Sequence, residues 1–157
     1  MKRRTVIILF LSVVIFSFGS YFFVKYDFEK VKEIKVTRDN YNKGIDFEYE
    51  IEDIVYCEKD VIITGWVAEV NDNNKYINRN IILKNEEEII AIKTEAKDFE
   101  YLKLKNTTKT NYNKCGIIGR VKNNKLLKNE NYQIGFIITN EDKRETIIFT
   151  DKFIEIS

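Results

Sequence analysis

Hydrophobic residues follow two different patterns along this chain, and the first of them predicts a membrane helix. From Thr5 to Val24 there are twenty residues without a charge, and a helix built from them would be apolar on both faces. Twenty helical residues rise about 30 Å, which matches the hydrocarbon core of a bilayer. Residues 1–26 therefore read as a short basic cap followed by a single transmembrane helix.

The charges that flank this run predict its orientation. Lys2, Arg3 and Arg4 precede the apolar residues, whereas Asp27 and Glu29 follow soon after them. Basic residues are retained on the cytoplasmic side of a membrane. We therefore expect a single-pass protein of the cell membrane, with a cytoplasmic N-terminus and residues 27–157 outside.

A cleavable signal peptide is the alternative interpretation of the same segment. Ser17 and Gly19 are small residues placed suitably for cleavage after Gly19, which would make the protein secreted. The apolar run continues past that point to Val24, and it is longer than a typical signal core. This length favours the uncleaved anchor, and the secreted form stays open as an alternative.

The second pattern has a period of two and predicts strands. Phe47, Tyr49 and Ile51 alternate with carboxylates, which is typical of a half-buried strand in an antiparallel sheet. Before this point, residues 27–44 are mixed and charged, and we interpret them as a stalk with one short strand at Ile34–Thr37. The extracytoplasmic domain would then span residues 45–157.

The next strand has apolar residues on both faces, so it should be a central strand covered on two sides. Gly65 within it indicates a bulge or a close approach of two backbones. Its apolar residues are Val61, Ile63 and Val67 on one face and Ile62, Trp66 and Val70 on the other.

Further short strands follow at intervals of about a dozen residues, separated by polar turns, and no convincing helical period occurs after Lys35. Even spacing of this kind predicts an all-β fold, an antiparallel β-sandwich of about eight or nine strands. The candidates are Tyr76–Lys84, Glu88–Thr94, Phe99–Lys105, Gly116–Lys122, Tyr132–Asn140, Thr146–Thr150 and Phe153–Ile156.

Composition narrows the function classes. Four of the 26 basic residues precede Asp27, which leaves 22 against 25 acidic residues in the rest of the chain, so no basic face for nucleic acid is expected. The chain has no histidine, which removes the commonest general base and metal ligand. We expect neither a catalytic constellation nor a metal or cofactor. We interpret the many asparagines, including the Asn106-Thr107-Thr108 sequon, as a matter of composition without a function of their own. The polar loop Asn106–Lys114 is the longest break between the expected strands.

Cys57 and Cys115 are the only cysteines, and they lie in a compartment where disulfides form. Each sits where a strand is expected to begin, which makes a bridge between strands reasonable. A loop of this length would contribute about 4 kcal/mol of stability in the chain-entropy model. The alternative is two buried free thiols.

Trp66 is the only tryptophan, and it has two interpretations. An exposed Trp66, with Tyr76 and other tyrosines near loops, would stack on sugar rings. A buried Trp66 would instead pack in the core beside Gly65, as expected for a central strand.

One resemblance to known proteins rests on the order of several motifs. A hydrophobic-Gly-Trp strand at Val61–Val67 is followed by Ile81–Leu83, by Gly116–Ile118, and by Leu126-Leu127 with Asn131–Gly135. This order resembles small bacterial extracytoplasmic β-sandwiches, similar to immunoglobulin-like domains or carbohydrate-binding modules, that accompany surface-polysaccharide assembly. The chain departs from that pattern at Ile117, where an aromatic residue is expected.

The resemblance supports the fold more than the function. The apolar anchor, the strand pattern and the lack of a catalytic constellation predict a non-catalytic module of the cell envelope. Its partners would be the membrane, through the N-terminal helix, and either an envelope protein or a surface glycan.

Overall fold

The computed structural model describes residues 3–28, 32–33, 46–74, 78–126, 130–140, 143 and 145–155. The chain divides into two compact units, Met1–Lys30 and Val31–Ser157. Most of the predicted stalk, including the strand expected at Ile34–Thr37, lies outside the described residues.

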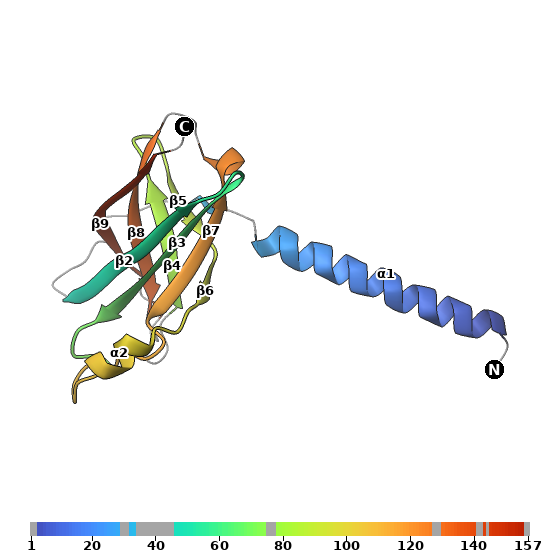
Figure 1. Ribbon diagram of the computed structural model, residues 1–157, viewed down its shortest axis with the longest axis horizontal. Helices are drawn as coiled ribbons and strands as arrows, with labels where there is room; N and C mark the ends of the chain where they lie inside the picture. The colour runs from blue at the N-terminus through green and yellow to red at the C-terminus, as the bar shows by residue number, and fades with distance from the viewer. Residues whose placement is uncertain are drawn as a thin grey trace. The chain divides into compact units, whose positions relative to one another are not determined.

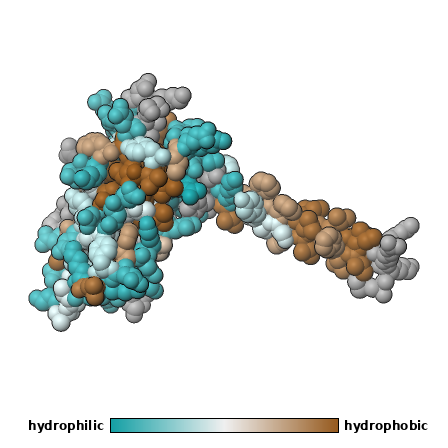
Figure 2. Space-filling model, viewed as in Figure 1, coloured by the Kyte–Doolittle hydropathy of each residue, from teal (hydrophilic) through white to brown (hydrophobic). Residues whose placement is uncertain are grey.

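The N-terminal unit is one helix, α1, from Arg3 to Phe28. Its stretch Thr5–Tyr26 is long and apolar enough to cross a membrane by length and composition. The hydroxyls of Ser12 and Ser17 donate to backbone carbonyls one turn earlier, at 2.8 and 2.9 Å, so they are satisfied within the helix. Figure 2 shows apolar side chains along this helix. The predicted apolar helix is confirmed.

The second unit is mostly β, with two antiparallel sheets (Figure 1). One sheet has the order β1-β5-β4-β8-β9, and the other has the order β2-β3-β7-β6. Its elements are β1 Lys32–Glu33, β2 Phe47–Tyr56, β3 Asp60–Glu69, β4 Asn78–Lys84, β5 Ile89–Ile92, β6 Thr94–Ala96, α2 Glu100–Lys105, β7 Gly116–Lys122, the 3-10 turn Asn123–Lys125, β8 Asn131–Thr139 and β9 Glu145–Glu155.

The main hydrophobic core draws on both sheets. Val61, Ile63 and Val67 of β3 belong to the same buried cluster as Ile134 and Phe136 of β8. The ring of Tyr49 on β2 lies 6.1 Å from that of Phe136, which adds a contact between residues of the two sheets. Burial of this apolar surface is the largest favourable contribution to the stability of the unit.

β3 is a central strand, as predicted. It pairs with β2 on one side and β7 on the other. Val61, Ile63 and Val67 enter the main core, whereas Trp66 and Ala68 belong to a second buried cluster. A Cβ on Gly65 would stand 2.4 Å from the backbone oxygen of Glu50, so the predicted close approach of two backbones is confirmed.

The segment Phe99–Lys105 was predicted to be a strand, and the structure corrects this to the helix α2. Its residues include glutamate, leucine and lysine, which are good helix formers. Glu100 lies in the first turn and Lys103 and Lys105 in the last, which matches the helix dipole. Six residues with one buried side chain, Leu102, are too few to show a helical period.

Two predicted strand boundaries also differ from the structure. The strand expected at Glu88–Thr94 divides at Lys93, because β5 pairs with β4 whereas β6 pairs with β7 in the other sheet. The two strands expected at Thr146–Thr150 and Phe153–Ile156 are one strand, β9. Its pairing with β8 shifts register between Gln133 and Gly135, which takes up the residues between the two halves.

Candidate functional site

Trp66 lies at one end of the β2-β3-β7-β6 sheet, where α2 and the following loop cover the face opposite the main core. Its side chain is 3% exposed and clusters with Leu102, Tyr112 and Cys115, with Phe99 packed against them. The rings of Trp66 and Tyr112 meet edge to face at 6.0 Å. This geometry is favourable for an aromatic pair and closes the outer surface of the sheet at this end.

Lys105, the last residue of α2, lies over this aromatic cluster. Its ammonium is 4.4 Å from the centroid of the Trp66 ring and 5.1 Å from that of Tyr112. It also forms an ion pair with Glu48 of β2 at 2.6 Å. A cation over an aromatic face is attracted to the ring electrons, so Lys105 links α2 to both the cluster and the sheet.

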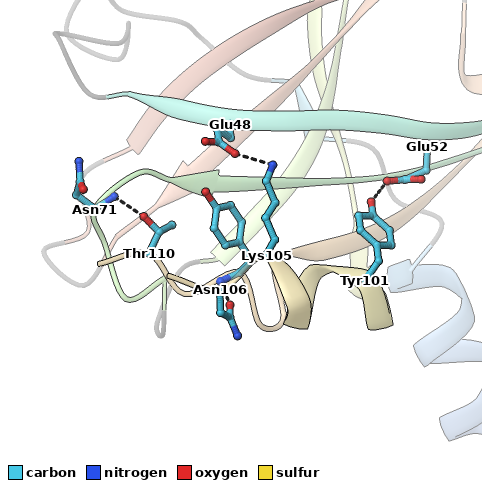
Figure 3. Close-up of polar contacts among 8 residues, drawn as sticks. Glu48, Glu52, Asn71, Tyr101, Lys105, Asn106 and Thr110 are labelled. Carbon is cyan, nitrogen blue, oxygen red and sulfur yellow. Dashed lines mark hydrogen bonds and ion pairs between the residues drawn. The ribbon is translucent and has the colours of Figure 1, made fainter. Parts of the chain in front are cut away.

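A second contact between α2 and β2 is made by Tyr101, whose hydroxyl donates to the carboxylate of Glu52. Figure 3 shows Glu48 and Glu52 on β2 facing Lys105 and Tyr101 of α2. Two glutamates on the acidic face of β2 therefore make the contacts that hold this short helix.

The environment shifts the pKa of three groups here. The hydrogen bond from Lys105 lowers the pKa of Glu48, against an opposing effect of burial. Burial and the neighbouring charge of Glu50 raise the pKa of Glu52. Burial and the hydrogen bond to Glu48 raise the pKa of Tyr112, so its hydroxyl stays protonated at neutral pH.

We expect the substitution Glu48→Gln to destabilise the β domain at neutral pH but not in acid. A lowered pKa means that the Glu48 carboxylate stabilises the fold above its ordinary value of 4.5, and that this contribution is lost as the pH falls through the lowered value. The loss at pH 7 should be under about 1 kcal/mol, because the pair is partly exposed. Urea denaturation of both proteins at pH 7 and at successively lower pH measures it.

Glu52 also contributes to the pH dependence of stability, because its pKa is shifted in the opposite direction. Both the original protein and Glu48→Gln retain Glu52, so its contribution cancels when the two are compared. A stability difference between the two proteins that does not diminish as the pH falls below 4.5 would show that the ion pair with Lys105 is not its source.

Arg79 of β4 holds the chain segments at this end of the domain together. The side chain is buried, with its Nε donating to the carbonyl of Val67 at 2.9 Å. Its Nη atoms donate to the carbonyls of Lys114 and Asn74 at 3.4 Å and contact the Cys115 Sγ at the same distance. Burial lowers the pKa of Arg79, but arginine keeps its charge at neutral pH.

A polar hollow of about 510 Å³ lies at this end of the domain, between the β3–β4 turn and the loop after α2. Asn73, in the turn between β3 and β4, forms one side, and the loop after α2 forms the rest. The lining side chains are amides, hydroxyls and one lysine: Asn73, Asn106, Thr107, Thr108, Lys109, Thr110, Asn111 and Asn113.

The two candidates for sugar stacking have different outcomes. Trp66 is buried beneath Lys105 and Tyr112, which is the alternative interpretation made from the sequence. In this arrangement its ring offers no open face for a sugar. Tyr76 lies outside the described residues.

The structure does not bring Cys57 and Cys115 together, and both are free thiols. The N–H of Cys57 donates to the carbonyl of Asp60, at the start of β3, whereas the carbonyl of Cys115 accepts from Val67, near its end. Asp60 and Val67 are seven positions apart along the strand, about 23 Å at 3.3 Å per residue. A disulfide requires Cα atoms within about 7 Å of each other.

Cys115 is buried and Cys57 is exposed. Burial raises the pKa of the Cys115 thiol, although nearby Arg79 opposes that effect. A thiol of this kind is protonated and unreactive at neutral pH.

Among the residues that the structure describes, no group of three or more cysteine, aspartate or glutamate side chains is arranged to hold a metal ion. The polar hollow is instead lined by groups that form hydrogen bonds.

Three features of this end of the domain were not predicted from the sequence: the buried Arg79, the position of Lys105 over two rings, and the hollow. The signal for the hollow was the length and polarity of the loop from Asn106 to Lys114. Comparison with other proteins adds nothing to this picture, since no protein-family model, curated protein or solved structure matches the chain.

Proposed function

We propose that this protein is a non-catalytic module of the bacterial cell envelope, held at the membrane by α1 and making contacts through its β domain. The observation that carries the proposal is the apolar stretch Thr5–Tyr26, followed in the same chain by a β domain with a hydrophobic core of its own. A helix that is apolar on every face is stable in lipid and costly to expose to water.

The β domain of this proposal is an antiparallel sandwich. Support comes from the main core, which combines buried residues of both sheets, and from the contact of Tyr49 with Phe136. Two sheets that bury their inner faces against each other form such a core.

The orientation that we propose places the β domain outside the cell. Lys2, Arg3 and Arg4 precede α1, and the positive-inside rule keeps such residues in the cytoplasm. Cleavage near Gly19 would give a secreted form of the same domain, with the same contact surface. The length of α1, which continues nine residues beyond Gly19 to Phe28, favours the anchored form.

A glycan is a specific candidate for the partner, because the hollow is lined by amides and hydroxyls. These groups form hydrogen bonds with sugar hydroxyls, and the loop that carries them is far from the chain's apolar helix in sequence. Stacking on Trp66 is not part of this proposal, since its ring lies under Lys105 and against Tyr112.

Fractionation of cells tests the anchored, outward-facing arrangement. The full-length protein should stay in the membrane pellet after carbonate extraction, and deletion of residues 2–26 should abolish this. Protease added to cells whose outer layers are permeable, but whose cytoplasmic membrane is intact, should remove the β domain. Protection of the β domain from that protease, alongside protection of a cytoplasmic control protein, would contradict the proposal.

A further inference from the structure

We propose that the polar hollow between the β3–β4 turn and the loop after α2 binds an acidic saccharide. This inference rests on the proposed function, because it names the class of ligand that the envelope module would contact. Three observations support it: the residues that line the hollow, the hydrogen bonds that fix the loop in one shape, and the lining donors that have no partner among the described residues.

The loop is held in one shape by its own side chains. The Thr107 hydroxyl oxygen accepts the N–H groups of Lys109 and Thr110 at 3.2 and 2.9 Å. The Asn106 Oδ1 accepts the N–H of Tyr112 at 2.7 Å. Because the Tyr112 side chain is buried against Trp66, the loop is fixed to the aromatic cluster beneath it.

The loop is also joined to the turn on the other side of the hollow. The Thr110 hydroxyl oxygen accepts the N–H of Asn71 at 2.8 Å (Figure 3), and the N–H of Asn111 donates to the carbonyl of Asp72 at 3.1 Å. Asn71 has φ 64°, a left-handed conformation that asparagine tolerates. A wall formed before the ligand arrives loses less conformational entropy on binding.

Two pairs of amides bridge the lining. Asn106 donates from Nδ2 to the Oδ1 of Asn113 at 3.1 Å, and Asn111 donates from Nδ2 to the Oδ1 of Asn73 at 3.0 Å. These bonds use the carbonyl oxygens of Asn73 and Asn113 as acceptors. Their NH₂ groups have no hydrogen bond to any residue that the structure describes.

The hollow therefore presents mainly donors to a ligand. Besides the NH₂ groups of Asn73 and Asn113, the Thr108 hydroxyl has no partner within the described part of the chain, and Lys109 adds an ammonium. No carboxylate is among the lining residues, although about a third of this chain is charged.

A ligand for this surface must be rich in acceptor oxygens and can carry negative charge. The ring and hydroxyl oxygens of a sugar match the amides, and a carboxylate on the sugar matches Lys109. A volume of about 510 Å³ is within the usual range for a small-ligand site. An acidic saccharide satisfies these requirements together.

The test is an NMR titration of the ¹⁵N-labelled full-length protein in a detergent that contains no sugar. The probes are trigalacturonate, which is acidic, and maltotriose, which is neutral. We expect saturable shifts of the NH₂ signals of Asn73 and Asn113, with trigalacturonate binding at least about threefold more tightly than maltotriose, the effect of one modest interaction.

Single substitutions identify the site. Asn73→Ala and Asn113→Ala should each weaken trigalacturonate binding at least about threefold, and Lys109→Gln should remove the preference for the acidic sugar. Asn124→Ala, which truncates an exposed asparagine outside the hollow, is the matched control and should bind as the original protein does. All four positions are exposed, and an unchanged Trp66 emission would show that each variant has folded.

Several results would overturn the inference. These are the absence of saturation by either sugar at millimolar concentrations, shifts that the substitutions leave unchanged, or shifts produced by phosphatidylglycerol vesicles and not by trigalacturonate. The titration uses purified protein, so its failure is separate from a failure of the cell fractionation, which tests where the domain resides.

Discussion

Replacing Phe136 with alanine should destabilise the β domain by about 3–5 kcal/mol, the usual cost of removing a buried aromatic ring. Phe136 lies in β8 and is 0% exposed, among the largest fully buried side chains. Its removal leaves a cavity in the core that both sheets share and ends the contact with Tyr49. Urea denaturation of the full-length protein in detergent, followed by far-ultraviolet circular dichroism, measures the change.

Phe153→Ala is the matched control for this core substitution. Phe153 lies on the neighbouring strand, β9, but it is 56% exposed. Its loss should therefore change the free energy of unfolding by less than about 1 kcal/mol. Equal losses for the two variants would mean that Phe136 does not occupy the centre of a core formed by both sheets.

Replacing Gly116 with alanine should both destabilise the domain and loosen the cover over Trp66. The added Cβ would stand 2.2 Å from the Lys97 carbonyl oxygen and 2.5 Å from the Phe99 ring. Overpacking of this kind usually costs about 1–3 kcal/mol of stability. Here one of the contacts is with a backbone atom, which cannot move away as a flexible side chain can. Phe99 must move, and α2 begins at the next residue. The fluorescence of Trp66 should therefore shift to longer wavelength and become easier to quench with acrylamide.

The control for this variant is Gly19→Ala, since a Cβ on Gly19 meets nothing within 4 Å. That variant should keep the emission of the original protein, which we expect to be at short wavelength because the Trp66 side chain is buried. An emission from Gly116→Ala that matches the original would show that the contact of Gly116 with Phe99 does not hold the cover in place.

The strands were predictable wherever a local pattern determines burial. The alternation of Phe47, Tyr49 and Ile51 marks β2, and the apolar residues on both faces of β3 mark it as central. Gly116–Lys122 matches β7 at both ends. These elements are recognisable because alternate residues of a strand face opposite sides of the sheet. The alternation of apolar and polar residues in the sequence therefore indicates which side is buried.

The elements that were wrongly predicted depend on contacts between distant parts of the chain. α2 is a helix at a place where its six residues alone would be only marginally helical. It is held by Glu48 and Glu52, about fifty residues earlier. In the same way, the change of sheet at Lys93 depends on which strand lies beside β5 and which beside β6.

The candidate site was predictable only in part. The sequence indicated that Trp66 was either a stacking platform or a core residue, and the structure places it in a core cluster. The positions of the two cysteines could not be predicted from the sequence. Only the backbone contacts along β3 show that Cys57 and Cys115 lie at opposite ends of that strand. The burial of Arg79 could not be expected, since it requires three backbone carbonyls from separate segments to converge.

The central proposal is that an intact α1 holds the β domain at the outer face of the membrane. The most direct test is the mass of the protein extracted from cells first treated with a maleimide that cannot cross the cytoplasmic membrane. We predict an uncleaved N-terminus and one maleimide adduct, on the exposed Cys57, with Cys115 protected until the protein is unfolded. A mass that corresponds to cleavage near Gly19, or an intact protein that is labelled only after the membrane is broken, would contradict it.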